Sequence, residues 1–356
     1  MHSTSPDKFS ATHRRAGRVS RGGNAASLVA GVATLCAGLA VPLVASAQES
    51  FPSRPIRLIV GLAPGGFSDQ SARLMAPELS KALGQSIIVE NRTGANGNLA
   101  ARYVADATPD GYTLGLAFDG TFVAGAAFNP QTPFDPVKDF AAITKIADTP
   151  VMLTVHPGLQ AGNIRELAEL IKKNLALARP VTLDYGTAGN GSTGHLTGEY
   201  LKQRAGLSMA HVPYKGGGDA LRDVMGGQIP LMLAAVAASS AQVKSGRLKA
   251  LAITGDKRLT SLPDVPTLAE GNIEGLKGFN VQSWTGLVAP PGTPRAIIER
   301  LHGEAVKILM RADVRERYAA IGAEVVANTP AEFNRQMAED LERWKRVITD
   351  AKLRTE

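Results

Sequence analysis

Cysteine is almost absent from this chain, since Cys36 is the only one among 356 residues. If the segment that holds it is removed, as argued below, the mature chain has no disulfide, thiolate metal site or cysteine nucleophile. Long apolar runs are absent after residue 44, so no later segment is long enough to span a bilayer. His156, His211 and His302 lack the close spacing of metal ligands, so neither a metal nor another cofactor is inferred.

The first 47 residues have the features of an export signal. A basic start between Lys8 and Arg21 precedes a nearly uncharged, small-apolar run over 25–44, and Ala45-Ser46-Ala47 has the form that signal peptidase reads. Cleavage after Ala47 places the expected product in the periplasm. The pair Arg14-Arg15 leaves two export routes open, the general secretory route and the twin-arginine route.

Removal of that segment changes the charge of the chain. It takes away five basic residues and one acidic residue, so the formal net charge falls from +7 to about +3. A charge this small argues against a nucleic-acid partner. The remaining length, about 309 residues, exceeds what one hydrophobic core usually organises, and it predicts two lobes.

Strands and helices alternate through the first part of the mature chain, which predicts a parallel α/β sheet. Pro77 lies inside the first helix and either kinks or shortens it. Gly84 ends that helix. The strands are expected at 56–60, 86–90 and 112–118, and the helices at 69–83 and 98–107.

A second α/β series begins near Val151. Its strands are expected at 150–157, 181–185, 210–212, 229–235 and 248–253, and its helices at 164–174, 193–204 and 219–225. The Pro- and Gly-rich stretch 258–278 predicts a crossing back to the first lobe. We therefore expect lobe I to comprise 48–150 and 273–356, and lobe II to comprise 151–272.

The last part of the chain holds a strand expected at 284–289, a helix opened by Thr293-Pro294, and a long terminal helix. Thr329 to Glu332 forms a capping box with proline at the first helical position. The terminal helix carries an apolar stripe, which we expect to pack on the first lobe. The stripe consists of Phe333, Met337, Leu341, Trp344 and Ile348.

Two glycine-rich loops carry the strongest functional signal. Residues 63–69 and 187–193 each follow a strand and precede a helix. Such a loop leaves backbone N–H groups unpaired at a helix N-terminus, which is a ready site for an anion. Two loops more than a hundred residues apart predict that each lobe offers half of one pocket. The hydroxyl donors expected to meet there are Ser68, Thr121, Thr187, Ser192 and Thr193.

Asp69 and Asp219 each follow a glycine loop and are expected to open a helix. As N-caps they would accept backbone N–H groups of the first turn, and this role is compatible with contact to a ligand. Paired carboxylates, a base–nucleophile pair and a phosphate-loop lysine are missing from these loops. The chemistry is that of carboxylate capture without catalysis.

Parts of the second loop match the motifs of two classes of enzyme. Residues 189–194 match G-x-G-x-x-G, but the acidic ribose ligand of a nicotinamide enzyme is missing from the end of the next strand. Ser192 with His195 suggests a hydrolase, yet the flanking glycines of a nucleophile elbow are absent. A histidine at such a helix start more often hydrogen-bonds its own loop. An exported hydrolase is therefore the rival, and no catalytic residue is assigned.

Seven blocks together resemble one known family over essentially the whole mature chain. The chain is similar to the solute-binding receptors of tripartite tricarboxylate transporters, often called Bug-type receptors. The blocks occur in the family's order and are FPSRPIRLIVGLAPGGFSD, VENRTGANGN, ATPDGYTL, YGTAGNGSTGHLTGE, HVPYKGGGDAL, LPDVPTLAE and WTGLVAPPGTP.

The resemblance implies a two-lobed α/β periplasmic binding protein of type II, a Venus flytrap in which each lobe is a central sheet flanked by helices. It implies a monomer that encloses a small organic acid, amino acid or carboxamide and presents it to membrane transporter subunits. A ligand-sensing receptor that feeds a signalling system is left open.

By position, the resemblance places ligand loops at 63–69 and 118–121 in lobe I, and at 187–193 and 216–219 in lobe II. In such receptors backbone amides, hydroxyls and bridging waters hold the carboxylate. The implied ligand-binding residues are Ala63, Pro64, Gly65, Gly66, Phe67, Ser68, Asp69, Asp119, Gly120, Thr121, Thr187, Ala188, Asn190, Ser192, Thr193, Gly217 and Asp219.

Asp119 departs from the family's pattern, because a small or hydroxyl residue is expected there. A carboxylate would repel a second anionic group on the solute and accept from an ammonium or amide N–H. This favours a solute with one carboxylate and one donor group. Alternatively, Asp119 turns to solvent or bonds its own loop near Thr121.

Overall fold

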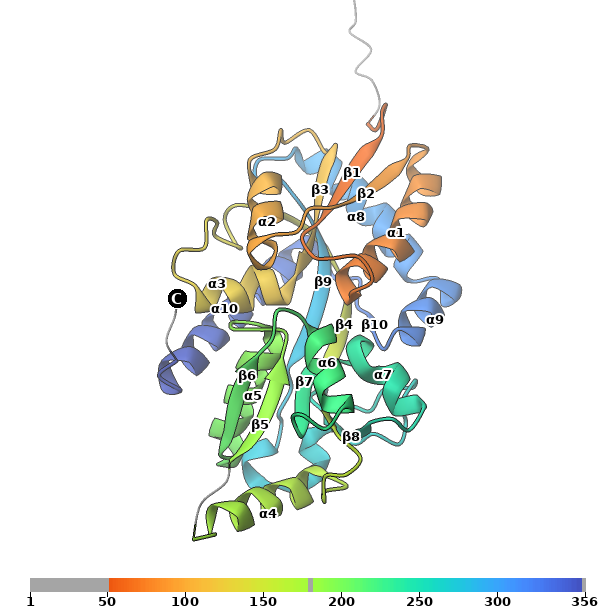
Figure 1. Ribbon diagram of the computed structural model, residues 1–356. Helices are drawn as coiled ribbons and strands as arrows, with labels where there is room; N and C mark the ends of the chain where they lie inside the picture. Colours follow the sequence, from red (N-terminus) through yellow and green to blue (C-terminus); the bar gives the residue numbers. More distant parts are fainter. Residues whose placement is uncertain (1–50, 179–181, 354–356) are drawn as a thin grey trace, which may run out of the picture. The chain divides into compact units, whose positions relative to one another are not determined.

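The computed structural model describes residues 51–178 and 182–353, and the expected export signal lies outside them (Figure 1). Eight strands form one continuous path in the order β2-β1-β3-β9-β4-β7-β5-β6, and β8 and β10 pair with β4 off this path. No helix within 51–178 and 182–353 is long and apolar enough to cross a membrane.

The first α/β series follows the predicted order. It consists of β1 (Ile56–Val60), α1 (Phe67–Leu83), β2 (Ile87–Asn91), α2 (Asn98–Ala105) and β3 (Thr113–Phe118). The strand β1 pairs in parallel with both β2 and β3, as the alternation predicts. Helix α1 contains Pro77 without shortening and ends at Gly84, which adopts the left-handed conformation. After β3 the chain enters the π-helical segment η2 (Gly120–Gly125) and α3 (Ala126–Phe128).

Two antiparallel strands join the halves of the sheet. The strand β9 (Gln282–Ala289) pairs with β3 on one side and with β4 (Ala141–Val155) on the other. Residues 141–150 of β4 pair with β9, whereas residues 151–155 pair with β7 and β8. A purely parallel sheet, as the alternation of elements suggests, is therefore wrong for the centre of the sheet.

The first nine residues of β4 were not expected to form a strand. Lys145 and Asp148 interrupt the apolar sequence there, but Lys145 Nζ lies 2.8 Å from Asp148 Oδ2. The charges neutralise one another, so Lys145 is buried inside the sheet.

The second series comprises α4 (Ile164–Leu175), β5 (Leu183–Thr187), α5 (Thr193–Ala205), β6 (Met209–Pro213), α6 (Gly217–Met225), β7 (Leu231–Ala235), α7 (Val236–Lys244) and β8 (Lys249–Ile253). The strand β5 lies in parallel between β6 and β7. Helix α7 has no counterpart in the sequence prediction, because its small and polar residues show little apolar periodicity.

The C-terminal part begins with the short helices η3 (Leu268–Gly271) and η4 (Glu274–Leu276) and continues with α8 (Arg295–Leu309), α9 (Ala312–Ala320), β10 (Glu324–Val325) and α10 (Pro330–Asp350). The predicted capping box at Thr329 and Glu332 is present.

The stripe on α10 is buried except for Leu341, which is partly buried. The helix packs on β4, α3 and η2, as expected for the first lobe, and also on α5. Gln203 of α5 donates to the carbonyl of Val347 at 2.9 Å. One hydrophobic cluster accordingly contains residues from both halves of the chain, including Phe122, Leu196 and Trp284.

Candidate functional site

Two helices at the predicted loops begin without a side-chain cap. Gly66 precedes α1 and Gly216 precedes α6, and neither N-cap supplies a side-chain hydrogen bond. The N–H groups of a first helical turn have no partner within the helix, and the helix dipole makes this end positive. These helix starts are therefore suited to an anionic ligand.

The predictions that Asp69 and Asp219 open their helices are wrong. Both lie third in the helix, because glycine supplies the N-cap in each case. Asp69 is buried and accepts from Gly65 N at 2.9 Å, from Asn91 Nδ2 at 3.0 Å and from Arg73 Nε at 3.0 Å. Burial opposes its ionisation, but these donors outweigh burial and hold the pKa of Asp69 below its usual range. Asp69 therefore stabilises the first loop through these hydrogen bonds.

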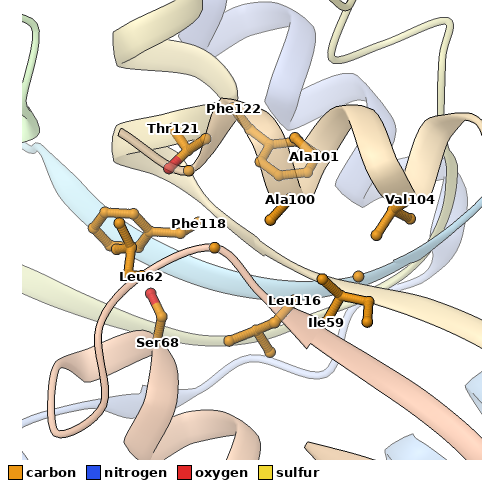
Figure 2. A pocket seen from close by; sticks show the side chains of 13 residues that line it. Ile59, Leu62, Ser68, Ala100, Ala101, Val104, Leu116, Phe118, Thr121 and Phe122 are labelled. Atoms are coloured by element: carbon orange, nitrogen blue, oxygen red, sulfur yellow. The ribbon is translucent and has the colours of Figure 1, made fainter. Parts of the chain in front are cut away.

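The tip of the first loop, residues 63–66, is exposed, whereas Phe67 and Ser68 are buried. Ser68 faces a small cavity between the loop, α2 and β3 (Figure 2). Thr121, Phe118 and Leu62 also line it, and its interior of about 10 Å³ holds about one water molecule. Every lining residue belongs to the first half of the chain. The cavity is therefore not the pocket shared by two lobes that the sequence predicts.

The glycines of the second loop have structural roles that require no bound nucleotide. Gly189 and Gly191 have φ of +123° and +69°, which few other residues adopt. Gly194 lies on β7 so closely that a Cβ atom would stand 2.2 Å from the carbonyl oxygen of Leu233. The G-x-G-x-x-G match therefore reflects a tight turn and close helix–strand packing.

Ser192 and His195 do not form a nucleophile–base pair. Ser192 caps α5: its Oγ accepts from the backbone N of His195 and donates to the carbonyl of Gly189 at 2.7 Å. The ring Nδ1 of His195 accepts from Gly191 N at 3.1 Å. The prediction that His195 bonds its own loop is confirmed.

His195 stacks on His211, with ring centroids 3.9 Å apart, and His211 Nε2 bonds Thr187 Oγ1 at 2.7 Å. Burial lowers the pKa of His195 to about 4 and that of His211 to about 3. Both imidazoles are therefore neutral at pH 7, and the acceptor role of His195 Nδ1 depends on that neutrality.

We expect acid to weaken the second loop through this histidine pair. A depressed pKa in the folded state means that stability is complete above about pH 6.5 and is lost as the pH falls toward 4, by up to about 1.4 kcal/mol per pH unit for each histidine. Urea unfolding at pH 7, 5.5 and 4.5 should show this loss, with a shallower fall in His195→Gln. Equal slopes in both proteins would contradict the assignment.

Asp119 adopts neither of its two predicted arrangements. Its carboxylate is buried, with Oδ2 accepting from Thr193 Oγ1 at 2.7 Å and Oδ1 accepting from Ser283 Oγ at 2.5 Å and Trp284 N at 3.3 Å. Gly120 also lies against Thr193, since a Cβ atom there would be 3.1 Å from Thr193 Oγ1. The structure thus joins the loop at 118–121 directly to the second glycine loop.

The remaining predicted residues lie apart from this contact. Ala188 and Asn190 are exposed at the tip of the second loop. A Cβ atom at Gly217 would meet nothing within 4 Å, so open space surrounds it. Asp219 is half-exposed and pairs with Arg222.

Sequence reasoning missed the part of the site that lies on β9 and α10. Besides Ser283 and the backbone of Trp284, the indole Nε1 of Trp284 donates to buried Asp340 at 2.9 Å. The rarity of tryptophan was the only signal, because Asp340 is one of many charged residues on an amphipathic helix. Within 51–178 and 182–353, no group of three or more His, Cys, Asp or Glu residues is placed to hold a metal ion.

Comparison with known proteins decides the family. The model of the tripartite tricarboxylate transporter family receptor, TctC, matches residues 71–353. The chain belongs to this receptor family. The TctC receptors are periplasmic solute-binding proteins, and the fold is accordingly the two-lobed periplasmic-binding-protein fold predicted from the sequence.

Curated relatives of this TctC receptor cover nearly its whole length. A UPF0065 protein of Agrobacterium vitis is 38% identical over 90% of this chain and 91% of the relative. The protein BugT of Bordetella pertussis is 34% identical over 92% of this chain and 98% of the relative.

Solved TctC-type structures agree with the fold. MatC from Rhodopseudomonas palustris, solved with bound malate, is 33% identical with a TM-score of 0.73 over 84% of this chain and 100% of that chain. Another protein of that organism, solved with adipate, is 33% identical with a TM-score of 0.77 over 85% of this chain and 98% of that chain.

Proposed function

We propose that this TctC receptor captures a small carboxylate-bearing solute between its two lobes and delivers it unchanged to a tripartite tricarboxylate-type membrane transporter. The observation that carries the proposal is the pair of glycine-capped helix starts at α1 and α6, whose first-turn N–H groups receive no cap side chain. Backbone amides at such ends bind carboxylates without catalytic groups.

We also propose which segments form each lobe and which loops contact the solute. Lobe I comprises 48–150 and 273–356, and lobe II comprises 151–272. The loops at 63–69, 118–121, 187–193 and 216–219 surround the solute. Because the hydroxyls of Ser192 and Thr193 donate within the protein, we assign the carboxylate contacts chiefly to backbone amides.

The solute is proposed to be a small organic acid. Related receptors have been solved with malate and with adipate, both of which carry two carboxylates. Asp119 is buried and both of its oxygens accept hydrogen bonds from the protein, so its carboxylate is not exposed to contact a second carboxylate of the solute. An amino acid and a carboxamide remain as comparison ligands.

Binding is tested by thermal and urea unfolding of the exported protein with malate, adipate, aspartate and adipamide. A true ligand at a hundredfold excess over its Kd should raise the free energy of unfolding by about 2.7 kcal/mol. The matched control for adipate is 1,6-hexanediol, which keeps the six-carbon chain and lacks both carboxylates; it should have no effect.

Mass spectrometry of the recovered ligand separates a receptor from an enzyme. We expect the bound acid to be recovered unchanged. Turnover of the ligand would overturn the receptor proposal, and stabilisation by hexanediol equal to that by adipate would overturn carboxylate recognition.

A further inference from the structure

Asp119 joins three elements that sequence places far apart. It follows β3 and begins η2, while its donors come from the first turn of α5 and from β9. Thr193 belongs to the proposed lobe II, whereas Asp119 and Ser283 belong to lobe I. One buried carboxylate therefore connects the two glycine-loop regions across the proposed interlobe boundary.

We propose that Asp119 is a positioning residue of the binding site, which holds the N-terminus of α5 against η2 and so favours the closed arrangement of the lobes. The proposal rests on the proposed function, and it adds how closure is controlled. Thr193 is the partner that must separate when lobe II moves away, whereas Ser283 and Trp284 remain with Asp119 in lobe I.

This contact links closure to proton uptake. Burial raises the pKa of Asp119 to about 7, and it outweighs the opposing hydrogen bonds from Ser283, Thr193 and Trp284. When Thr193 leaves, water reaches the carboxylate and its pKa falls toward the ordinary value near 4. The closed state therefore binds a proton more tightly than the open state. The equilibrium between the two states shifts toward the closed state as the pH falls below 7.

Two other titratable groups lie on the elements packed against Asp119. Asp340 on α10 raises the pKa of Asp119, and Asp340 is itself paired with Arg343 at 2.8 Å. His195 on α5 has its pKa lowered to about 4 and stays neutral from pH 6 to 8.

The strand next to β9 contributes a second, partly buried carboxylate. Asp148 of β4 lies opposite Trp284 in the sheet, and its pKa is raised by burial. Its partner Lys145 lies on the same strand. The pair of Asp148 and Lys145 therefore stays intact when α5 separates from η2, and a variant at Asp119 distinguishes the two carboxylates.

The experiment measures lobe closure and affinity against pH. Small-angle scattering of the exported, ligand-free protein should give a smaller radius of gyration at pH 6 than at pH 8. The Kd for adipate, measured by calorimetry, should be about tenfold lower at pH 6 than at pH 8, because one proton is taken up below pH 7. The carboxylates of adipate are largely ionised throughout this range.

Three variants test the residue, and a fourth is a control. Asp119→Asn should remove most of the pH dependence of both quantities. Thr193→Val keeps the shape and removes a donor that favours the ionised carboxylate, so it should strengthen the pH dependence, whereas Thr193→Ser should keep the parent profile. Asp264→Asn, at an exposed carboxylate away from the site, should leave the parent profile unchanged. Circular dichroism confirms that each variant folds.

The outcomes separate this proposal from the proposed function. If no acid binds the parent protein, the proposed function fails, while the scattering profile still decides the role of Asp119. An identical pH profile of the radius in the parent and in folded Asp119→Asn overturns the positioning role. A tenfold affinity change between pH 8 and pH 6 that persists in folded Asp119→Asn overturns it as well.

Discussion

Gly194→Ala is expected to destabilise the protein by about 3 kcal/mol, at the upper end of what overpacking causes. The added methyl group would lie 2.2 Å from the carbonyl oxygen of Leu233, which is backbone of the central strand β7 and has little room to move. Relief requires α5 to shift away from the sheet. Urea unfolding monitored by circular dichroism measures the loss directly.

Gly303→Ala is the matched control, because it makes the same change on α8 at a position where a Cβ atom meets nothing within 4 Å. Alanine has the higher helix propensity, so this variant should gain about 0.5–1 kcal/mol. Opposite signs for the two substitutions would establish that close packing, not helix propensity, requires glycine at 194. If Gly194→Ala matched the parent, the described packing of α5 on β7 would be wrong.

The local elements were predictable because each leaves a local signal. The strands β1 and β5 precede glycine turns, and the capping box at Thr329 identifies the start of α10. The first part of β4 leaves none, since Lys145 and Asp148 neutralise each other only once the strand has formed. The antiparallel position of β9 depends likewise on pairing between residues more than a hundred positions apart.

The candidate site shows the same limit. The glycine loops could be identified from the sequence because turn glycines and helix starts leave signals within short stretches of sequence. The predicted N-cap of α1 was wrong by three residues, because the N-cap is Gly66 and not Asp69. The partners of Asp119 were out of reach, since Thr193 and Ser283 lie 74 and 164 positions away and neither has a local reason to face a carboxylate.

Gly66→Asp is expected to raise stability slightly while weakening solute binding about a hundredfold. Gly66 has φ −74° and ψ 171°, an extended conformation open to any residue, and its nearest atom to a new Cβ is the carbonyl oxygen of Ala63 at 3.7 Å. Aspartate fits there without strain and caps α1. The gain over glycine is a few tenths of a kcal/mol from the cap, with a further contribution from the helix dipole.

The loss of binding has the same cause as the gain in stability. A cap carboxylate accepts the first-turn N–H groups that we assign to the solute, and it repels the incoming anion. Losing hydrogen bonds to a charged group costs about 1.5–3 kcal/mol each, and about 2.7 kcal/mol corresponds to a hundredfold change in Kd. Gly66→Asn caps with a neutral side chain of the same shape and should lose less. Calorimetry with adipate and urea unfolding on the same samples supply both quantities; unchanged affinity in a folded Gly66→Asp protein would mean that the α1 amides do not hold the carboxylate.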